Sequence, residues 1–86
     1  MWMIDISLDV TPERMAARPA HRELLTRLHA EGVVRMAGPF ADDAGAMIIL
    51  DVPDRAAVEA FLAADPYYAA AGVTVANIRE WNPFVQ

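Results

Sequence analysis

A histidine lies in the middle of an apolar stripe, where it could carry acid–base chemistry. With about 100° of rotation per helical residue, His21 falls on the same stripe as Leu24, Leu25 and Leu28. We therefore expect its imidazole to point toward the interior. Histidine is the side chain used most often as a general acid or base in enzymes. The structural alternative is a partly buried histidine that hydrogen-bonds a backbone carbonyl.

An aspartate in the next helical segment shows the same anomaly. Asp65 follows Val58, Phe61 and Leu62 at helical spacing, so the helix predicted here turns it inward too. An aspartate in the last turn of a helix is opposed by the helix dipole, at a cost of about 0.3–1 kcal/mol, and needs a compensating interaction. One such interaction is structural, because Asp65 followed by Pro66 is a typical N-cap for a short helical turn. One carboxylate can serve both as a cap and in a functional site.

Together, His21 and Asp65 could form a general acid–base pair. A carboxylate beside an imidazole holds it in one tautomer and favours its charged form. The expected helices run roughly parallel, with Asp65 at the end of the second and His21 near the middle of the first. Contact between them therefore depends on the stagger of the two helices.

Three further polar residues are candidates for substrate binding: Arg18, Tyr67 and Ser7. Arg18 precedes His21 by three positions and could bind an anionic group or pair with an acid. Tyr67, close to Asp65, could line a pocket or donate a hydrogen bond, although buried tyrosines do this in any small core. The sequence has no glycine-rich phosphate loop, no cluster of metal ligands and no nucleophile elbow. We therefore expect chemistry without a metal or another cofactor.

Positive charge is concentrated in one segment of an acidic chain. Residues 14–35 contain five arginines and two glutamates, a local balance of +3, while the whole chain carries −5. A solvated helix face whose arginines pair with acids elsewhere explains this pattern. A positive electrostatic field that attracts a small anionic substrate also explains this concentration of arginines.

Composition also limits the partners. The negative total charge argues against binding to nucleic acid. No apolar run is long enough to span a membrane, and the N-terminus lacks the basic start and apolar stretch of a signal peptide. We therefore expect a cytoplasmic protein with no membrane partner.

Periodicity and capping residues predict the elements that must position these side chains. They are a strand over 2–8, a helix from the N-cap Thr11 to Glu31, strands over 33–40 and 46–52 joined by a short turn, a helix from Asp54 to Pro66, a short turn over 67–71 and a last strand over 73–81. Pro19 is expected to kink or restart the first helix. Gly32 is expected to end it in the left-handed conformation.

The order β-α-β-β-α-β is typical of a single α+β domain with a ferredoxin-like fold, spanning residues 1–86. Right-handed crossovers place both helices on one face of the sheet. The hairpin strands are apolar on both faces, since Met47 and Ile49 alternate with Ile48 and Leu50. The second face therefore needs a cover, and a chain of 86 residues without cysteine is marginal for a core of its own. We expect a homodimer in which two sheets pack face to face as a dimeric α+β barrel.

Short motifs spread along nearly the whole chain carry a resemblance to a known family. They are Arg18-Pro19-Ala20-His21, Gly38-Pro39 at the end of a strand, Ala64-Asp65-Pro66-Tyr67 and Ala71-Gly72-Val73. In their order and spacing the chain resembles the YciI-like family, the YCII-related domain proteins. The resemblance implies a ferredoxin-like fold, a dimeric α+β barrel and an active site centred on a histidine and an aspartate, which His21 and Asp65 match. The link between the second and third strands is shorter here than in some relatives, so no loop contribution to the pocket is carried over.

These observations favour a small cofactor-independent enzyme acting on a small molecule. His21, oriented by Asp65, would move a proton on a cyclic or anionic substrate in a reaction of the isomerase or lyase type. The alternative is a non-catalytic module of the same fold that binds a small ligand or a protein partner. A third hypothesis, cofactor-free oxidation of an aromatic substrate, rests on analogy of fold alone. Much of the family has no assigned reaction, so the resemblance predicts a site and no substrate.

Overall fold

Seven elements follow one another in the computed structural model, which describes residues 1–86. They are β1 (Trp2–Leu8), α1 (Pro12–Ala30), β2 (Val34–Pro39), β3 (Gly45–Leu50), α2 (Arg55–Ala63), the short 3₁₀ helix η1 (Pro66–Ala69) and β4 (Val73–Glu80). The order β-α-β-β-α-β confirms the predicted ferredoxin-like plan. The strand ends differ from the predicted ones by one or two residues.

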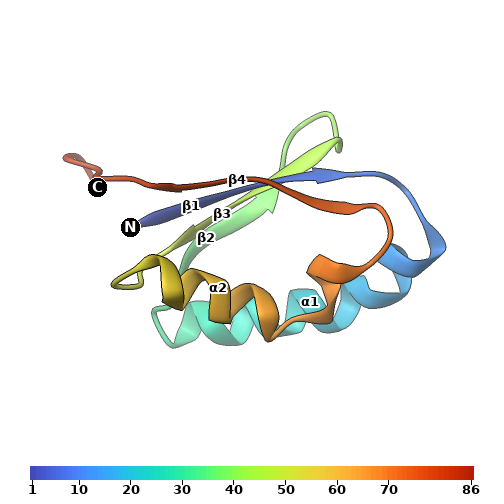
Figure 1. The fold of residues 1–86 in the computed structure, drawn as a ribbon, viewed down its shortest axis with the longest axis horizontal. Coiled ribbons are helices and arrows are strands. Elements are labelled where there is room, and N and C mark those ends of the chain that lie inside the picture. Colours follow the sequence, from blue (N-terminus) through green and yellow to red (C-terminus); the bar gives the residue numbers. More distant parts are fainter.

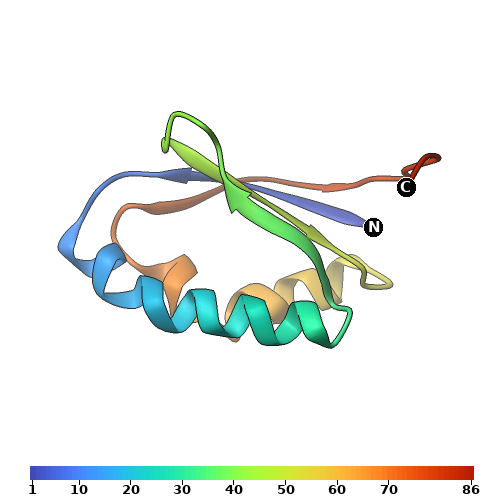
Figure 2. The same cartoon turned by 180° about the vertical axis from the view of Figure 1, so that it is seen from behind.

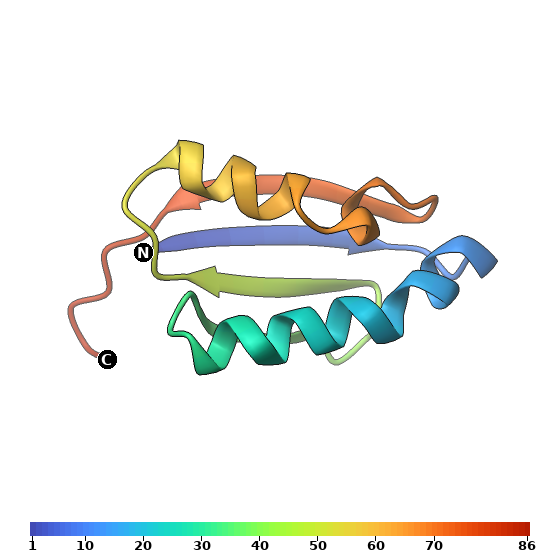
Figure 3. The same ribbon diagram turned by 90° about the horizontal axis from the view of Figure 1, so that it is seen from below.

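The four strands form one antiparallel sheet in the order β2-β3-β1-β4. Both α-helices lie on the same face of this sheet (Figure 1). Seen from the helix side, α1 and α2 lie along the strands and run in opposite directions, α1 on the β2–β3 side of the sheet and α2 over β4, and η1 continues from the end of α2 (Figure 3). Neither helix is both long enough and apolar enough to cross a membrane.

Side-chain caps explain where both helices begin. The hydroxyl of Thr11 accepts a hydrogen bond from the backbone N–H of Arg14 at 3.1 Å, and Asp54 accepts one from that of Ala57 at 2.9 Å. After α1, Gly32 takes the left-handed conformation with φ 84°, as its type and place predict.

The expected restart of the first helix at Pro19 does not occur. α1 runs without interruption from Pro12 to Ala30. Proline removes the amide that would bond the carbonyl four residues earlier, which belongs to Met15. Pro19 and Met15 are both exposed, so that carbonyl can be hydrated and the helix continues.

The core lies between the sheet and the helices. Its buried members come from every layer: Ile4, Ile6, Val34, Ile48, Leu50, Val58, Phe61, Tyr67 and Val73. On β1, alternation places Ile4 and Ile6 on the helix side and sends Met3, Asp5 and Ser7 to the opposite face. The strand register therefore decides which polar side chains can reach a site beneath the sheet.

No element of the chain covers the opposite face of the sheet (Figures 1 and 2). An apolar patch lies there, which we call the methionine patch: Met3, Met36, Met47, Ile49 and Trp81. Met36 is 69% exposed and Trp81 is 48% exposed. The C-terminal tail beyond β4 extends away from the body of the domain (Figure 1) and carries Phe84, which is 98% exposed.

Candidate functional site

The structure brings His21 and Asp65 into direct contact. Nδ1 of His21 lies 2.6 Å from Oδ2 of Asp65. The two side chains are 10% and 5% exposed, so water does not compete for this hydrogen bond. A carboxylate at Nδ1 fixes the neutral imidazole in the tautomer that carries hydrogen on Nδ1 and a lone pair on Nε2.

Asp65 reaches His21 from η1, although the sequence pattern placed it on the inner face of the second helix. α2 ends at Ala63, and Asp65 is the N-cap of η1. Its second oxygen, Oδ1, accepts a hydrogen bond from the backbone N–H of Tyr67 at 3.0 Å. The carboxylate therefore combines the two roles considered for it, and η1 packs against α1 to bring it to His21.

Two consecutive tyrosines of η1 restrict the imidazole ring. The ring of Tyr67 stacks on that of His21, with centroids 3.9 Å apart and planes 9° from parallel. Tyr68 meets the same ring edge-on, with centroids 5.3 Å apart and planes at 90°. With Asp65 holding one ring nitrogen, these contacts leave the imidazole a single orientation.

The hydroxyl of Tyr68 is buried and has no hydrogen-bond partner in the chain. Burial raises the pKa of this hydroxyl far above its ordinary value, and the negative charge of Asp65 and the neighbouring Tyr67 raise it further. Tyr68 therefore stays a neutral phenol at physiological pH and contributes to the site through its ring.

Arg14 is a site residue that the sequence interpretation missed. Its Nε donates a hydrogen bond to the hydroxyl oxygen of Tyr67 at 2.9 Å, and its Nη1 donates to the carbonyl of Asp9 at 3.2 Å. Arg14 is only 8% exposed. The spacing of Arg14, Arg18 and His21 at i, i+4 and i+7 was the available signal, because these positions share one face of a helix.

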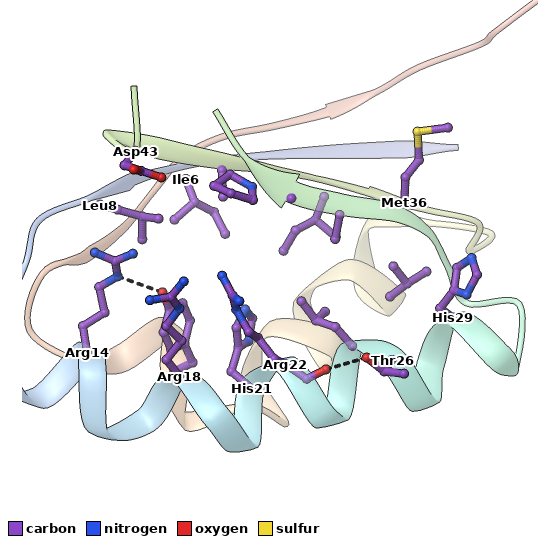
Figure 4. A pocket seen from close by; sticks show the side chains of 18 of the residues that line it. Ile6, Leu8, Arg14, Arg18, His21, Arg22, Thr26, His29, Met36 and Asp43 are labelled. Atoms are coloured by element: carbon purple, nitrogen blue, oxygen red, sulfur yellow. Dashed lines mark hydrogen bonds between the residues drawn. The ribbon is translucent and has the colours of Figure 1, made fainter. Parts of the chain in front are cut away.

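A cleft of about 760 Å³ opens between α1 and the β2–β3 part of the sheet, and His21 lies on its wall. This volume lies within the usual range for small-molecule sites, roughly 300–1,000 Å³. Figure 4 shows Arg14, Arg18, His21 and Arg22 rising from α1 on the side of the cleft. Nε2 of His21 has no partner in the chain.

Of the three residues predicted to bind substrate, two line the cleft and one does not. Arg18 lines the cleft beside His21 and forms no ion pair, so the alternative of a simple pair with an acid does not hold. Tyr67 lines the same cleft and stacks on the histidine. Ser7 is exposed on the opposite face of the sheet, beside Gly45 and Thr74, and does not reach the cleft. Because successive side chains of a strand point to opposite faces of the sheet, Ser7 lies on the face away from His21.

The chain contains no group of three or more His, Asp or Glu side chains that could hold a metal ion.

A family model described as the YCII-related domain matches residues 1–82, which include every element and every residue of the site. No curated protein matches the chain.

Proposed function

This chain belongs to the YCII-related domain family, and we propose that it is a cofactor-independent enzyme in which His21 moves a proton on a small molecule bound in the cleft. The reaction class is that of an isomerase or a lyase. One observation carries the proposal: a histidine bonded through Nδ1 to a buried carboxylate at 2.6 Å lies on the wall of an open cleft. A base, a group that orients it and room for a substrate are the parts that general acid–base catalysis needs.

Each residue has a defined part in the proposed reaction. Asp65 accepts the hydrogen bond from Nδ1–H, which leaves the lone pair of Nε2 free to act as the base. Nε2 removes a proton from a C–H bond of the substrate, and the electron pair of that bond forms a new double bond to the neighbouring carbon, which gives up the π bond or the leaving group that it carried. The imidazolium formed is stabilised by the carboxylate of Asp65. In an isomerisation the proton returns to a different carbon, whereas in an elimination the electron pair expels a leaving group.

Proton exchange with solvent tests this proposal even while the natural substrate is unidentified. A panel of cyclic enones, unsaturated lactones and hydroxylated aromatic acids is incubated with the protein in D₂O, and deuterium incorporation is followed by NMR. We expect the wild type to accelerate exchange or conversion of at least one compound, and a His21→Asn variant to lose that activity. Equal rates with the two proteins would contradict the proposal. Saturable binding with no exchange across the panel would instead favour the non-catalytic ligand-binding module.

We also propose that two copies of the chain pack through the methionine patch, as a dimeric α+β barrel. The chain exposes 5466 Å², against roughly 5,000 Å² for a folded monomer of its mass. The excess includes apolar side chains on a sheet face that no element covers, of which Trp81 and Met36 are the largest exposed. A two-fold axis through this face would pack the methionine patch of one chain against the same patch of the other, so that both patches are covered.

A charge placed in the methionine patch should break the proposed dimer. Met47→Glu would bury two carboxylates, one from each copy, without partners, and we expect the dimer to dissociate at least about 100-fold more readily. Sedimentation velocity at micromolar protein concentrations measures this. Ala60→Glu adds the same charge on the exposed side of α2 and should leave the dimer intact. A wild type that sediments as a monomer at all concentrations would refute the proposed interface.

A further inference from the structure

We propose that the cleft binds a carboxylate group through Arg14, Arg18 and Arg22, so that the ligand is a small carboxylate with an apolar ring or chain. This inference names the substrate class of the site proposed above and rests on that function only in calling the ligand a substrate. The evidence is that the arginines without an acid partner lie mainly on the wall of the cleft.

Most charges on this protein are negative, yet three arginines of the cleft have no acid partner. The chain has seven arginines and twelve acidic residues. Three arginines form ion pairs, in the pairs Arg27–Glu31, Arg35–Asp51 and Arg55–Glu59. Of the four left without a carboxylate, Arg14, Arg18 and Arg22 line the cleft, and Arg79 lies on the opposite face of the sheet. Although acidic residues outnumber arginines in the chain, the unpaired arginines give the cleft a positive charge.

Arg14 gives the strongest evidence, because its charge is buried. It is 8% exposed and donates hydrogen bonds only to neutral acceptors, the hydroxyl of Tyr67 and the carbonyl of Asp9. A guanidinium has five N–H groups. Those that Arg14 does not use in these two bonds have no acceptor in the chain and are accessible in the cleft, because the Tyr68 hydroxyl is the only buried side-chain polar atom without a partner. Burial of a charge without a counter-ion is costly. A ligand carboxylate in the cleft would supply the missing negative charge.

The cationic groups form a row on one face of α1. Arg14, Arg18 and Arg22 follow one another at intervals of four residues, and their side chains rise toward the cleft in Figure 4. Asp43 is the only acid on the cleft wall. A cleft with charges of one sign and low-dielectric walls concentrates the field and attracts ions of the opposite sign.

The apolar side chains of the cleft wall indicate what kind of group is attached to the carboxylate of the ligand. Ile6, Leu8 and Ile48 from the sheet face the row of arginines, and Leu25 continues the wall on the helix. An apolar ring or chain would pack on these side chains while its carboxylate meets the guanidinium groups, which bind carboxylates in a bidentate geometry. His21, three residues after Arg18 on α1, lines the same cleft. A carboxylate held by these arginines would therefore place the attached carbon skeleton near Nε2.

Benzoate is a suitable probe, with benzamide as a neutral molecule of the same shape. Binding is followed by ¹H–¹⁵N NMR titration of the full chain at low salt. We expect benzoate to bind at least about tenfold more tightly than benzamide, and added NaCl to weaken benzoate binding. Arg18→Gln and Arg22→Gln should each weaken benzoate binding about 3–10-fold. Arg27→Gln is the matched control on the same helix, because Arg27 pairs with Glu31 and does not line the cleft, and it should change the affinity less than twofold.

The outcomes separate the anion site from the proposed catalysis. No saturable benzoate binding, equal affinity for benzoate and benzamide, or unchanged affinity in both Arg18→Gln and Arg22→Gln would each overturn the inference. If no compound exchanges protons but benzoate binds in this charge-dependent way, the proposed reaction fails while the carboxylate site stands.

Discussion

Replacing His21 by Asn is expected to lower turnover about 10²–10⁴-fold, the usual contribution of one general acid or base. The amide nitrogen of asparagine occupies nearly the position of Nδ1, so it can still donate to Asp65, which lies 2.6 Å from Nδ1 in the wild type. Asparagine has no group at the position of Nε2 and cannot accept a proton there. The variant therefore removes the proposed base and keeps the buried hydrogen bond. Turnover is measured with whichever compound exchanges protons in the wild type.

The control for this variant is its stability. Because Asp65 keeps a donor, we expect the free energy of unfolding in urea to fall by only about 1–2 kcal/mol, mainly from the lost stacking on Tyr67. His21→Ala removes the donor as well and leaves a buried carboxylate oxygen unsatisfied, which costs a further 1–3 kcal/mol or so. A folded His21→Asn protein with undiminished turnover would show that the histidine is structural.

Local patterns in the sequence were sufficient for the fold. Alternating residues in β1, the caps Thr11 and Asp54 and the left-handed Gly32 each act over a few residues, so their effect can be read without tertiary information. For Pro19 the sequence left a kink or a restart open, and the continuous α1 excludes the restart. Whether the helix continues depends on solvent access to the carbonyl of Met15, which only the folded chain defines.

The site could be predicted only in part, since it depends on how the elements meet. The stripe of α1 correctly indicated that His21 is buried. The contact with Asp65 could not be calculated, because it is made by η1 after α2 has ended, and no local pattern fixes the packing of η1 on α1. Arg14 was missed for a related reason. Its spacing from His21 indicates a shared helix face, but its buried position depends on Tyr67, a partner that is distant in sequence.

The two roles of Asp65 can be separated by comparing Asp65→Asn with Asp65→Ala. Asparagine is as good an N-cap as aspartate, so the bond from the backbone N–H of Tyr67, 3.0 Å long in the wild type, should persist. We expect the free energy of unfolding to fall by no more than about 1 kcal/mol in Asp65→Asn. Asp65→Ala loses the cap, at about 0.5–2 kcal/mol, and leaves Nδ1–H of His21 buried without an acceptor, at about 1–3 kcal/mol. Urea unfolding monitored by circular dichroism distinguishes the two variants.

Turnover should fall about 10²–10⁴-fold in both variants, for different reasons. In Asp65→Asn the amide nitrogen faces His21 and donates to Nδ1, which moves the ring hydrogen to Nε2 and leaves no lone pair toward the cleft. Long-range ¹H–¹⁵N NMR spectra of the ring report this change of tautomer directly. If Asp65→Asn keeps the stability and the turnover of the wild type, the carboxylate serves η1 as a cap and does not orient a base, because the amide preserves the cap and removes only the acceptor for Nδ1.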